Sequence, residues 1–188
     1  MLDAPDHSGR SQHAQIWSIL ADIPVDSQLL LEAALNRPSL APSSLYHDHW
    51  LFAAARQAGQ AEAAWPRLER CFRLLDAGFT TMPEEDGEFG WIRSECHAWS
   101  SWPAQILLEE VLGLRLTGPA SMEIHAGVRP GLTWAEGTRP WRNDLVTCRW
   151  EASGEKLRLS GRIPAGLSAT LVLADGTRRA LPEGLFAL

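Results

Sequence analysis

Apolar positions recur at helical spacing through the first 113 residues, and each apolar segment is bounded by a residue that starts or stops helices. Pro66 lies inside the fourth segment, where it either kinks the helix or marks its true start. Short connections between the early segments predict antiparallel helical hairpins. The five predicted helices lie between Ser11 and Pro24, Asp26 and Pro38, Ser43 or Ser44 and Gly59, Ala61 and Asp76, and Ser101 and Gly113.

After about Leu114 the pattern changes to short, often alternating stretches separated by Gly, Pro, Asn and Asp. Regular spacing of this kind with turn residues between the stretches is typical of a β-sandwich. Ala174-Asp175-Gly176-Thr177 predicts a hairpin turn. The predicted strands are Met122–Val128, Leu132–Thr138, Leu145–Trp150, Leu157–Arg162, Ala169–Leu173 and Arg178–Leu181.

Charge follows the same division of the chain. Residues 1–113 carry 16 acidic and 7 basic side chains, against 7 and 10 in the remainder, and the whole chain has a formal net charge of -6. An acidic chain lacks the basic surface that nucleic-acid binding needs. No apolar run is long enough for a membrane helix, and the polar N-terminus does not have the profile of a signal peptide, so we expect a cytoplasmic protein.

Three cysteines at wide spacing, Cys71, Cys96 and Cys148, form neither a disulfide framework nor a zinc pattern. His47-Asp48-His49 does not favour a metal site, because residues two apart on a helix face different directions. Cys96 beside His97 does not favour a cysteine nucleophile, because sequence neighbours seldom face each other as nucleophile and base. We therefore expect no metal and no cofactor.

The segment from Gly78 to Trp102 is too long for a simple connection between helices, which is typical of functional or disordered loops. Its middle, Asp86–Gly90, is acidic and glycine-rich, but the flanks carry Trp91, Trp99 and Trp102 among titratable side chains. The chain has nine tryptophans and one tyrosine. Aromatic faces beside carboxylates and an imidazole are what a sugar-binding cleft needs, although most single tryptophans are core residues.

An ordered series of motifs then resembles the end of the catalytic domain of bacterial α-L-rhamnosidases. The resemblance covers nearly the whole chain and implies an α+β multidomain protein. Its expected parts are a partial (α/α)6 six-hairpin toroid of about five helices over residues 1–115 and a small antiparallel β-sandwich over residues 116–188. The motifs are Gly78-Phe-Thr-Thr-Met-Pro-Glu84, Arg93-Ser-Glu-Cys-His97-Ala-Trp99-Ser, Val111-Leu-Gly-Leu, Gly127-Val-Arg-Pro130, Leu132-Thr-Trp-Ala-Glu-Gly137 and Leu157–Pro164.

The resemblance implies hydrolysis of α-L-rhamnosides with inversion, in which one carboxyl group protonates the leaving oxygen and a second activates water. It places the base role on Glu84 and a sugar contact on His97, with Trp99 as a further candidate for the sugar pocket. Glu85 is the obvious alternative base. On residue type alone, Glu84 is typical of an exposed loop acid, and His97 is equally consistent with a buried histidine that braces the loop.

The motif that carries the family's general acid lies in the N-terminal half of the barrel and has no counterpart in this sequence. The resemblance therefore implies a rhamnosidase portion that is inactive or nearly so by itself. Five helices would leave inward faces uncovered, which favours association with the missing barrel half or with a second copy. The alternative is a non-catalytic module that binds carbohydrate or a partner chain, and a purely structural remnant is a third interpretation.

Overall fold

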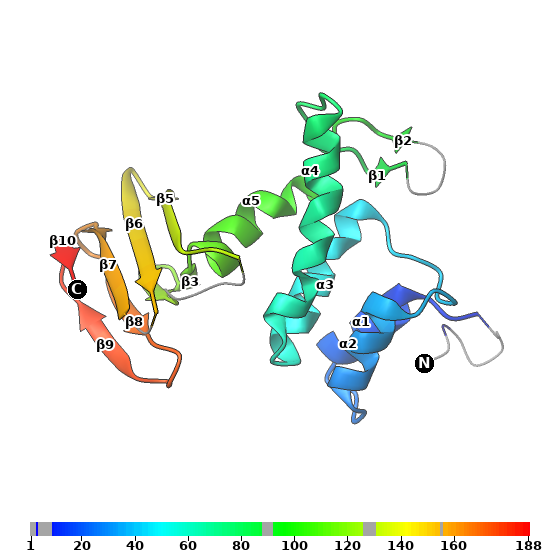
Figure 1. Ribbon diagram of the computed structural model, residues 1–188, viewed down its shortest axis with the longest axis horizontal. Coiled ribbons are helices and arrows are strands. Elements are labelled where there is room, and N and C mark those ends of the chain that lie inside the picture. Colours follow the sequence, from blue (N-terminus) through cyan, green and yellow to red (C-terminus); the bar gives the residue numbers. More distant parts are fainter. Residues whose placement is uncertain (1–2, 4–8, 88–91, 126–130, 155) are drawn as a thin grey trace. The chain divides into compact units, whose positions relative to one another are not determined.

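The computed structural model describes residue 3 and residues 9–87, 92–125, 131–154 and 156–188 (Figure 1). The chain divides into two compact units, residues 1–103 and residues 104–188. The first unit is mainly helical and the second mainly β-sheet. Within the described residues, no helix is both long and apolar enough to cross a membrane.

Two of the predicted helix starts in the helical unit are confirmed by side-chain caps. The Ser11 hydroxyl accepts a hydrogen bond from the Ala14 amide at 3.2 Å, and an oxygen of Asp26 accepts from the amides of Gln28 and Leu29. Such caps satisfy amides that the first turn of a helix leaves without partners. The helices of this unit are α1 (Gln12–Leu20), α2 (Ser27–Asn36), α3 (Asp48–Gln57) and α4 (Leu68–Asp76), with 3₁₀ segments η1 (Leu45–His47), η2 (Ala61–Arg67) and η3 (Ala98–Ser101).

The third and fourth predicted helices each begin with a 3₁₀ segment rather than with regular α-helix. The Ser43 hydroxyl does not cap the third helix, because it donates to Gln12 Oε1 at 3.0 Å, and Ser44 makes no capping bond. Pro66 lies in η2, and α4 begins only at Leu68. Proline lacks the amide hydrogen that an α-helix interior needs, which explains why regular helix starts after it.

The core of the helical unit lies where α1 packs against α2 and α3. Its fully buried side chains include Ile16, Leu31, Leu51 and Phe52. Trp102 closes one side of this core: its indole Nε1 donates to the Leu45 carbonyl at 2.9 Å, and its ring lies 5.2 Å from the ring of Phe52. Trp102 is therefore a core residue and not part of an exposed sugar platform.

The predicted fifth helix consists of three short segments: η3, α5 (Trp102–Ile106) and a π-helical turn, η4 (Leu107–Val111). Gly113 ends it with a φ of 87°, a conformation that glycine adopts without strain. Residues 104–115 belong to the β-sheet unit, where Trp150 Nε1 donates to the Val111 carbonyl at 3.2 Å. The family's domain boundary near residue 115 stays a prediction.

The β-sheet unit holds two four-stranded sheets that share one apolar core (Figure 1). One sheet has the order β10-β7-β6-β5, and the other has the order β3-β4-β8-β9. All pairs are antiparallel except β4 with β8. The strands are β3 (Leu114–Gly118), β4 (Ser121–Ile124), β5 (Trp134–Trp141), β6 (Asp144–Ser153), β7 (Lys156–Ile163), β8 (Ser168–Val172), β9 (Arg178–Leu181) and β10 (Gly184–Ala187).

The α+β class and the two-sheet architecture predicted from the sequence are confirmed. The hairpin turn at 174–177 is also confirmed, with a φ of 82° at Gly176 and a bond from the Leu173 amide to the Thr177 carbonyl. The sequence did not predict β3 or β10, which are short. The predicted strand Met122–Val128 ends at Ile124 within the described residues, and residues 126–130 lie outside them.

Inward-facing residues from both sheets fill the sandwich core, with Trp150 fully buried at its centre. Alternate residues of a strand point to opposite faces, which explains the buried and exposed alternation along β6. Gly161 on β7 lies so close to β6 that a Cβ there would stand 2.1 Å from the Thr147 carbonyl oxygen. The sheet therefore requires glycine at this position.

Candidate functional site

The loop from Gly78 to Trp102 folds back on itself through main-chain hydrogen bonds. The Glu84 amide donates to the Ser94 carbonyl at 3.1 Å, and the His97 amide donates to the Met82 carbonyl at 2.8 Å. Between these bonds, β1 (Glu85–Asp86) pairs antiparallel with β2 (Ile92–Arg93). The predicted base and the predicted sugar contact thus lie on the two arms of one hairpin. Residues 88–91, which include Trp91, lie outside the described residues.

Two acidic side chains of this hairpin, Glu84 and its alternative Glu85, are predicted as the base. Glu84 and Glu85 are both half-buried, whereas Glu95 is exposed. Alternation along an extended backbone directs Glu84 and Asp86 to one side and Glu85 to the other. Glu84 and Glu85 therefore cannot reach the same bound molecule in the same way, and a variant at each distinguishes them.

The segment η1 packs against β1 of the hairpin and against η3, which follows it. It brings Tyr46 to the hairpin: the Tyr46 ring lies 5.5 Å from the His97 ring and 6.5 Å from the Trp99 ring. His97 and Trp99 are themselves 5.3 Å apart with nearly perpendicular rings. The sequence-predicted residues His97 and Trp99 are thus neighbours, and Tyr46 completes a cluster of three rings.

Exposure differs within this ring cluster. Trp99 has 75% of its surface exposed, while His97 and Tyr46 are half-buried. His97 Nε2 is buried and has no hydrogen-bond partner among the described residues. An exposed indole face offers the flat apolar surface on which a sugar's C–H face stacks, and the imidazole beside it offers a polar edge.

The ring contacts continue from Tyr46 along α1 and α3. His47 lies 5.9 Å from Tyr46, 4.0 Å from His13 and 5.7 Å from Trp17, and Trp17 lies 5.1 Å from Trp50. Burial and the neighbouring His13 lower the pKa of His47 to about 4, so that its imidazole is neutral at pH 7. The aromatic surface of this unit is therefore larger than the predicted loop alone.

A buried ionic network fixes the hairpin to the helices. The Arg70 guanidinium on α4 donates to both carboxylate oxygens of Asp86, from Nε at 2.7 Å and from Nη2 at 3.0 Å. Its Nη1 donates to Asp48 Oδ2 at 3.0 Å. This two-pronged geometry is the strongest form of side-chain ion pair, so Arg70 holds β1 in place against α3 and α4.

Further polar contacts support Asp48 at Oδ1, the carboxylate oxygen other than the one to which Arg70 Nη1 donates. The Ser43 hydroxyl donates to Asp48 Oδ1 at 3.4 Å, Arg67 Nη1 lies 3.9 Å from the same oxygen, and Arg67 Nη2 donates to Gln12 Oε1 at 3.2 Å. Asp48 itself is 0% exposed. Burial raises its pKa to about 6, while Arg70 and Arg67 oppose that rise.

Sequence reasoning missed Arg70 and the role of Asp48, which was considered only as part of a metal pattern. A signal was present: Arg70 lies among Leu68, Cys71 and Leu74 on the apolar side of α4, where an unpaired charge would be costly. A charged residue at such a position implies a buried partner. The identity of that partner depended on the tertiary structure, because Asp48 and Asp86 are far from Arg70 in sequence.

The described residues hold no group of three or more His, Cys, Asp or Glu side chains arranged for a metal ion. In the His47-Asp48-His49 segment, the Asp48 carboxylate is bound to Arg70. Burial raises the pKa of the Cys71 and Cys148 thiols to about 12, so neither is a thiolate near neutral pH.

A match to a known family lies within the β-sheet unit. Residues 121–184 match the model of the bacterial alpha-L-rhamnosidase C-terminal domain. No significant match was found among curated proteins. The resemblance to bacterial α-L-rhamnosidases indicated by the sequence motifs is therefore confirmed over residues 121–184.

Solved structures of low sequence identity share the fold across nearly the whole chain. The native α-L-rhamnosidase of Aspergillus terreus aligns with a TM-score of 0.76 at 17% identity, over 95% of this chain and 24% of its own. A rhamnosidase of Bacillus sp. GL1 aligns with 0.73 at 20% identity, over 90% and 19%. The Streptomyces avermitilis α-L-rhamnosidase, solved with L-rhamnose, aligns with 0.65 at 20% identity, over 94% and 20%. The chain thus spans about a fifth to a quarter of these proteins.

Proposed function

We propose that this chain is the part of an inverting α-L-rhamnoside hydrolase that supplies the general base and part of the sugar-binding wall. Glu84 is the base, His97 contacts the sugar, and Trp99 provides a stacking face. The observation that carries this proposal is the hairpin that places Glu84 and His97 on adjacent arms, with the Tyr46 and Trp99 rings beside His97.

In the proposed reaction, the Glu84 carboxylate takes a proton from a water molecule as its oxygen attacks the anomeric carbon of the rhamnoside. The bond from that carbon to the leaving oxygen breaks, and a second carboxyl group gives its proton to the leaving oxygen. The attack comes from the face opposite the leaving group, so the configuration inverts. Arg70 keeps Glu84 in register by holding Asp86, two residues further along the chain.

The proton donor of this reaction is proposed to lie in the preceding half of the barrel, as the family resemblance implies. A base without an acid on the opposite face of the sugar contributes little to a reaction that needs both. The chain by itself is therefore expected to bind a rhamnoside and to hydrolyse it very slowly. That barrel half is the proposed partner.

The test measures hydrolysis of 4-nitrophenyl α-L-rhamnopyranoside by the longest natural polypeptide that contains this chain. We expect Glu84→Gln to lower kcat by roughly 10²- to 10⁴-fold with a small change in KM. Glu85→Gln is the matched control, because it removes the same charge from the neighbouring residue, and we expect its kcat within about twofold of the parent. Proton NMR of the first product should show the inverted anomer.

The outcomes separate the alternatives clearly. A large loss in Glu85→Gln with activity retained in Glu84→Gln would move the base to Glu85. Equal turnover by the parent and both variants would remove this hairpin from the mechanism. Retention of configuration would remove the two-carboxylate inverting scheme.

A second candidate function is non-catalytic carbohydrate binding, which two exposed aromatic features of the helical unit favour: the Trp99 ring, and the Trp17 and Trp50 rings that contact each other. L-Rhamnose titrated into the chain alone should perturb the indole NMR signal of Trp99, and His97→Ala should abolish that perturbation. If no natural polypeptide carrying this chain hydrolyses the aryl rhamnoside while this binding persists, the binding function replaces the catalytic one.

A further inference from the structure

The outer face of the sheet β10-β7-β6-β5 carries polar and aromatic side chains in register across its strands. Trp134 on β5 pairs with Glu151 on β6, and Glu151 pairs with Arg158 on β7. Directly paired residues of antiparallel strands point to the same face, so these three side chains form one row. Arg149 and Ser160 belong to the next row of the same face.

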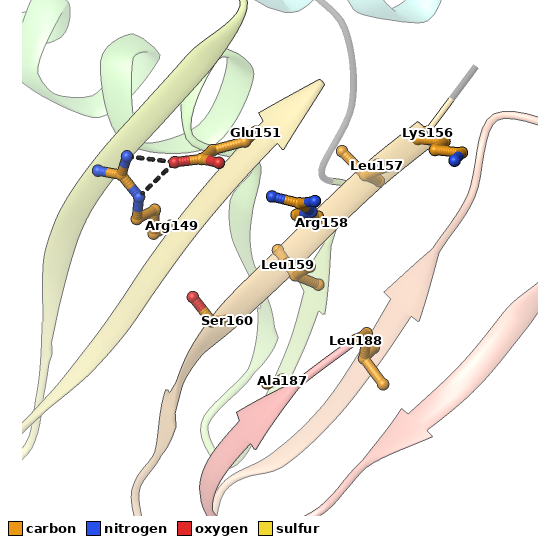
Figure 2. Close-up of a pocket in the computed structure, with 9 residues that line it drawn as sticks. All are labelled: Arg149, Glu151, Lys156, Leu157, Arg158, Leu159, Ser160, Ala187 and Leu188. Carbon is orange, nitrogen blue, oxygen red and sulfur yellow. Dashed lines mark hydrogen bonds and ion pairs between the residues drawn. The ribbon is translucent and has the colours of Figure 1, made fainter. Parts of the chain in front are cut away.

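A shallow cavity of about 590 Å³ lies on this face (Figure 2). Figure 2 shows Arg149 and Glu151 on β6, with Lys156, Arg158 and Ser160 following along β7. Its volume falls within the range of small-molecule sites, which is roughly 300–1,000 Å³. The C-terminal residue Leu188, which lines the cavity, is fixed to β7 because Leu159 and Leu188 exchange two main-chain hydrogen bonds of 3.1 and 2.8 Å.

The cationic side chains of this cavity differ in their ion-pair partners. Arg149 donates from Nε to Glu151 Oε1 at 3.1 Å and also binds Glu136, while its Cζ lies 5.1 Å from the Trp134 ring centre. Hydrogen bonds from Arg149 lower the pKa of Glu151, which is therefore ionised at neutral pH. No ion pair joins Lys156 or Arg158 to a partner within the described part of the chain. The charge of Arg158, which pairs across the strands with Glu151, also lowers the pKa of that carboxyl, and the side chains of both Arg158 and Lys156 are exposed to a ligand.

We propose that this face binds a saccharide that carries a carboxylate, such as a uronic acid residue. Arg158 takes the carboxylate in a two-pronged ion pair, with Lys156 adding charge. Ser160 and Glu151 hydrogen-bond to sugar hydroxyl groups, and the exposed Trp134 ring beside the row receives an apolar face of the sugar. Such exposed contacts are individually weak, so the dissociation constant is expected to be on the order of 1 mM.

The proposal does not depend on the proposed rhamnoside hydrolysis, because the two sites lie in different units and their ligands differ. A titration of this face reports on β7 and β10 amides, whereas rhamnose binding at the hairpin reports on His97 and Trp99. Failure of either function is therefore recognised separately.

The experiment titrates the full chain with methyl α-D-glucuronoside and, in parallel, with methyl α-D-glucoside, while amide NMR signals are followed. We expect saturable shifts at Arg158, Ser160 and Ala187 with the glucuronoside, and at least about tenfold weaker binding of the neutral sugar, because a charge-assisted pair is lost. Binding of the glucuronoside should also weaken as salt is added.

Two variants test the residues. Arg158→Gln should weaken glucuronoside binding about tenfold, and Arg179→Gln, which removes the same charge from β9 in the other sheet, should leave binding unchanged. Arg158 is exposed, so its variant is expected to keep the unfolding midpoint of the parent. Lys156→Gln is a second variant and should weaken binding to a smaller degree.

Several results would overturn the proposal. Equal binding of the charged and neutral sugars would exclude recognition of the carboxylate. Sodium acetate that reproduces the same shifts at the same concentrations would show a simple anion site rather than a saccharide site. The absence of saturable shifts at these amides, or shifts that are insensitive to both the Arg158 and Lys156 variants, would remove the site altogether.

Discussion

The two units of this chain use their interiors in different ways. The helical unit buries a polar network of Arg70, Asp48, Ser43 and Gln12 together with its apolar residues. The sandwich core is apolar, and the ion pairs of Arg149, Arg162 and Arg178 lie on partly exposed surfaces. Buried polar groups are expensive unless they are fully paired, so their presence suggests a purpose beyond stability.

That purpose in the helical unit is the placement of a loop. Arg70 uses its guanidinium to connect α3, α4 and the hairpin that carries Glu84. The sandwich core itself is apolar, but the β-sheet unit also buries two carboxylates: Glu109 and Glu110 on η4 pair with Arg139 on β5 and Arg115 on β3. The comparison teaches that buried ion pairs serve different elements in the two units: Arg70 fixes a loop, whereas Arg115 and Arg139 fix the η4 turn to its neighbouring strands.

The strongest test of the apolar interior is Trp150→Ala. Trp150 is 0% exposed, and its removal leaves a large cavity at the centre of the sandwich, so we expect a loss of about 3–5 kcal/mol in the free energy of unfolding. Denaturant unfolding followed by amide NMR of β6 and β7 measures this loss. Trp134→Ala on the exposed face is the control and should cost much less. Similar losses in both variants would contradict the assigned core.

The polar interior is tested by Arg70→Met. The substitution leaves Asp48 buried without its ion pair and releases Asp86, so we expect a loss of about 3 kcal/mol and faster hydrogen exchange at the Glu84 and His97 amides. Arg73→Met on the same helix is the matched control, because Arg73 is exposed, and should change stability by less than about 0.5 kcal/mol. Unchanged exchange at the hairpin amides would show that Arg70 does not position the loop.

The pH dependence of stability should differ between the parent and His47→Asn. His47 is 4% exposed, and its pKa of about 4 in the folded chain lies below the ordinary value of 6.5. The unfolded state therefore binds the proton more readily than the folded state. The stabilising contribution of the buried, neutral His47 is lost as pH falls from about 6.5 toward 4. We expect the difference in unfolding free energy between parent and variant to change by about 2 kcal/mol across this range.

Asp48 acts in the opposite direction over part of the same range, because its raised pKa makes the folded state bind the proton more readily between about pH 4 and 6. Asp48 is present in both the parent and His47→Asn, so its contribution cancels in the difference between their unfolding free energies. A difference that does not vary with pH would contradict the burial of a neutral His47.

The smallest effect is expected from Arg162→Gln on the sandwich surface. Hydrogen bonds from Arg162 lower the pKa of Asp144 to about 2. In the variant we expect that pKa to return toward about 3.9, with only a slight change in the unfolding midpoint that disappears in high salt. Carboxyl NMR titration measures the pKa. A large destabilisation would show that surface ion pairs carry more of the sandwich's stability than its apolar core implies.

The sequence by itself determined the elements whose causes are local. Ser11 and Asp26 cap their helices as predicted, Gly176 forms the predicted hairpin turn, and alternation identified most of the strands. These features depend on residues a few positions apart, and the same local motifs carried the family resemblance. The candidate residues Glu84, His97 and Trp99 were also chosen from motifs, and their roles stay predictions.

Only the tertiary structure decided which distant residues meet. It brought Tyr46 to His97 and Trp99, joined Arg70 to Asp48 and Asp86, and aligned Trp134, Glu151 and Arg158 across three strands. It also paired the short strand β3 with β4 and the short strand β10 with β7, and placed β4 parallel to β8. The physical reason is that these contacts depend on packing and register between segments that are far apart in sequence, which local propensity does not encode.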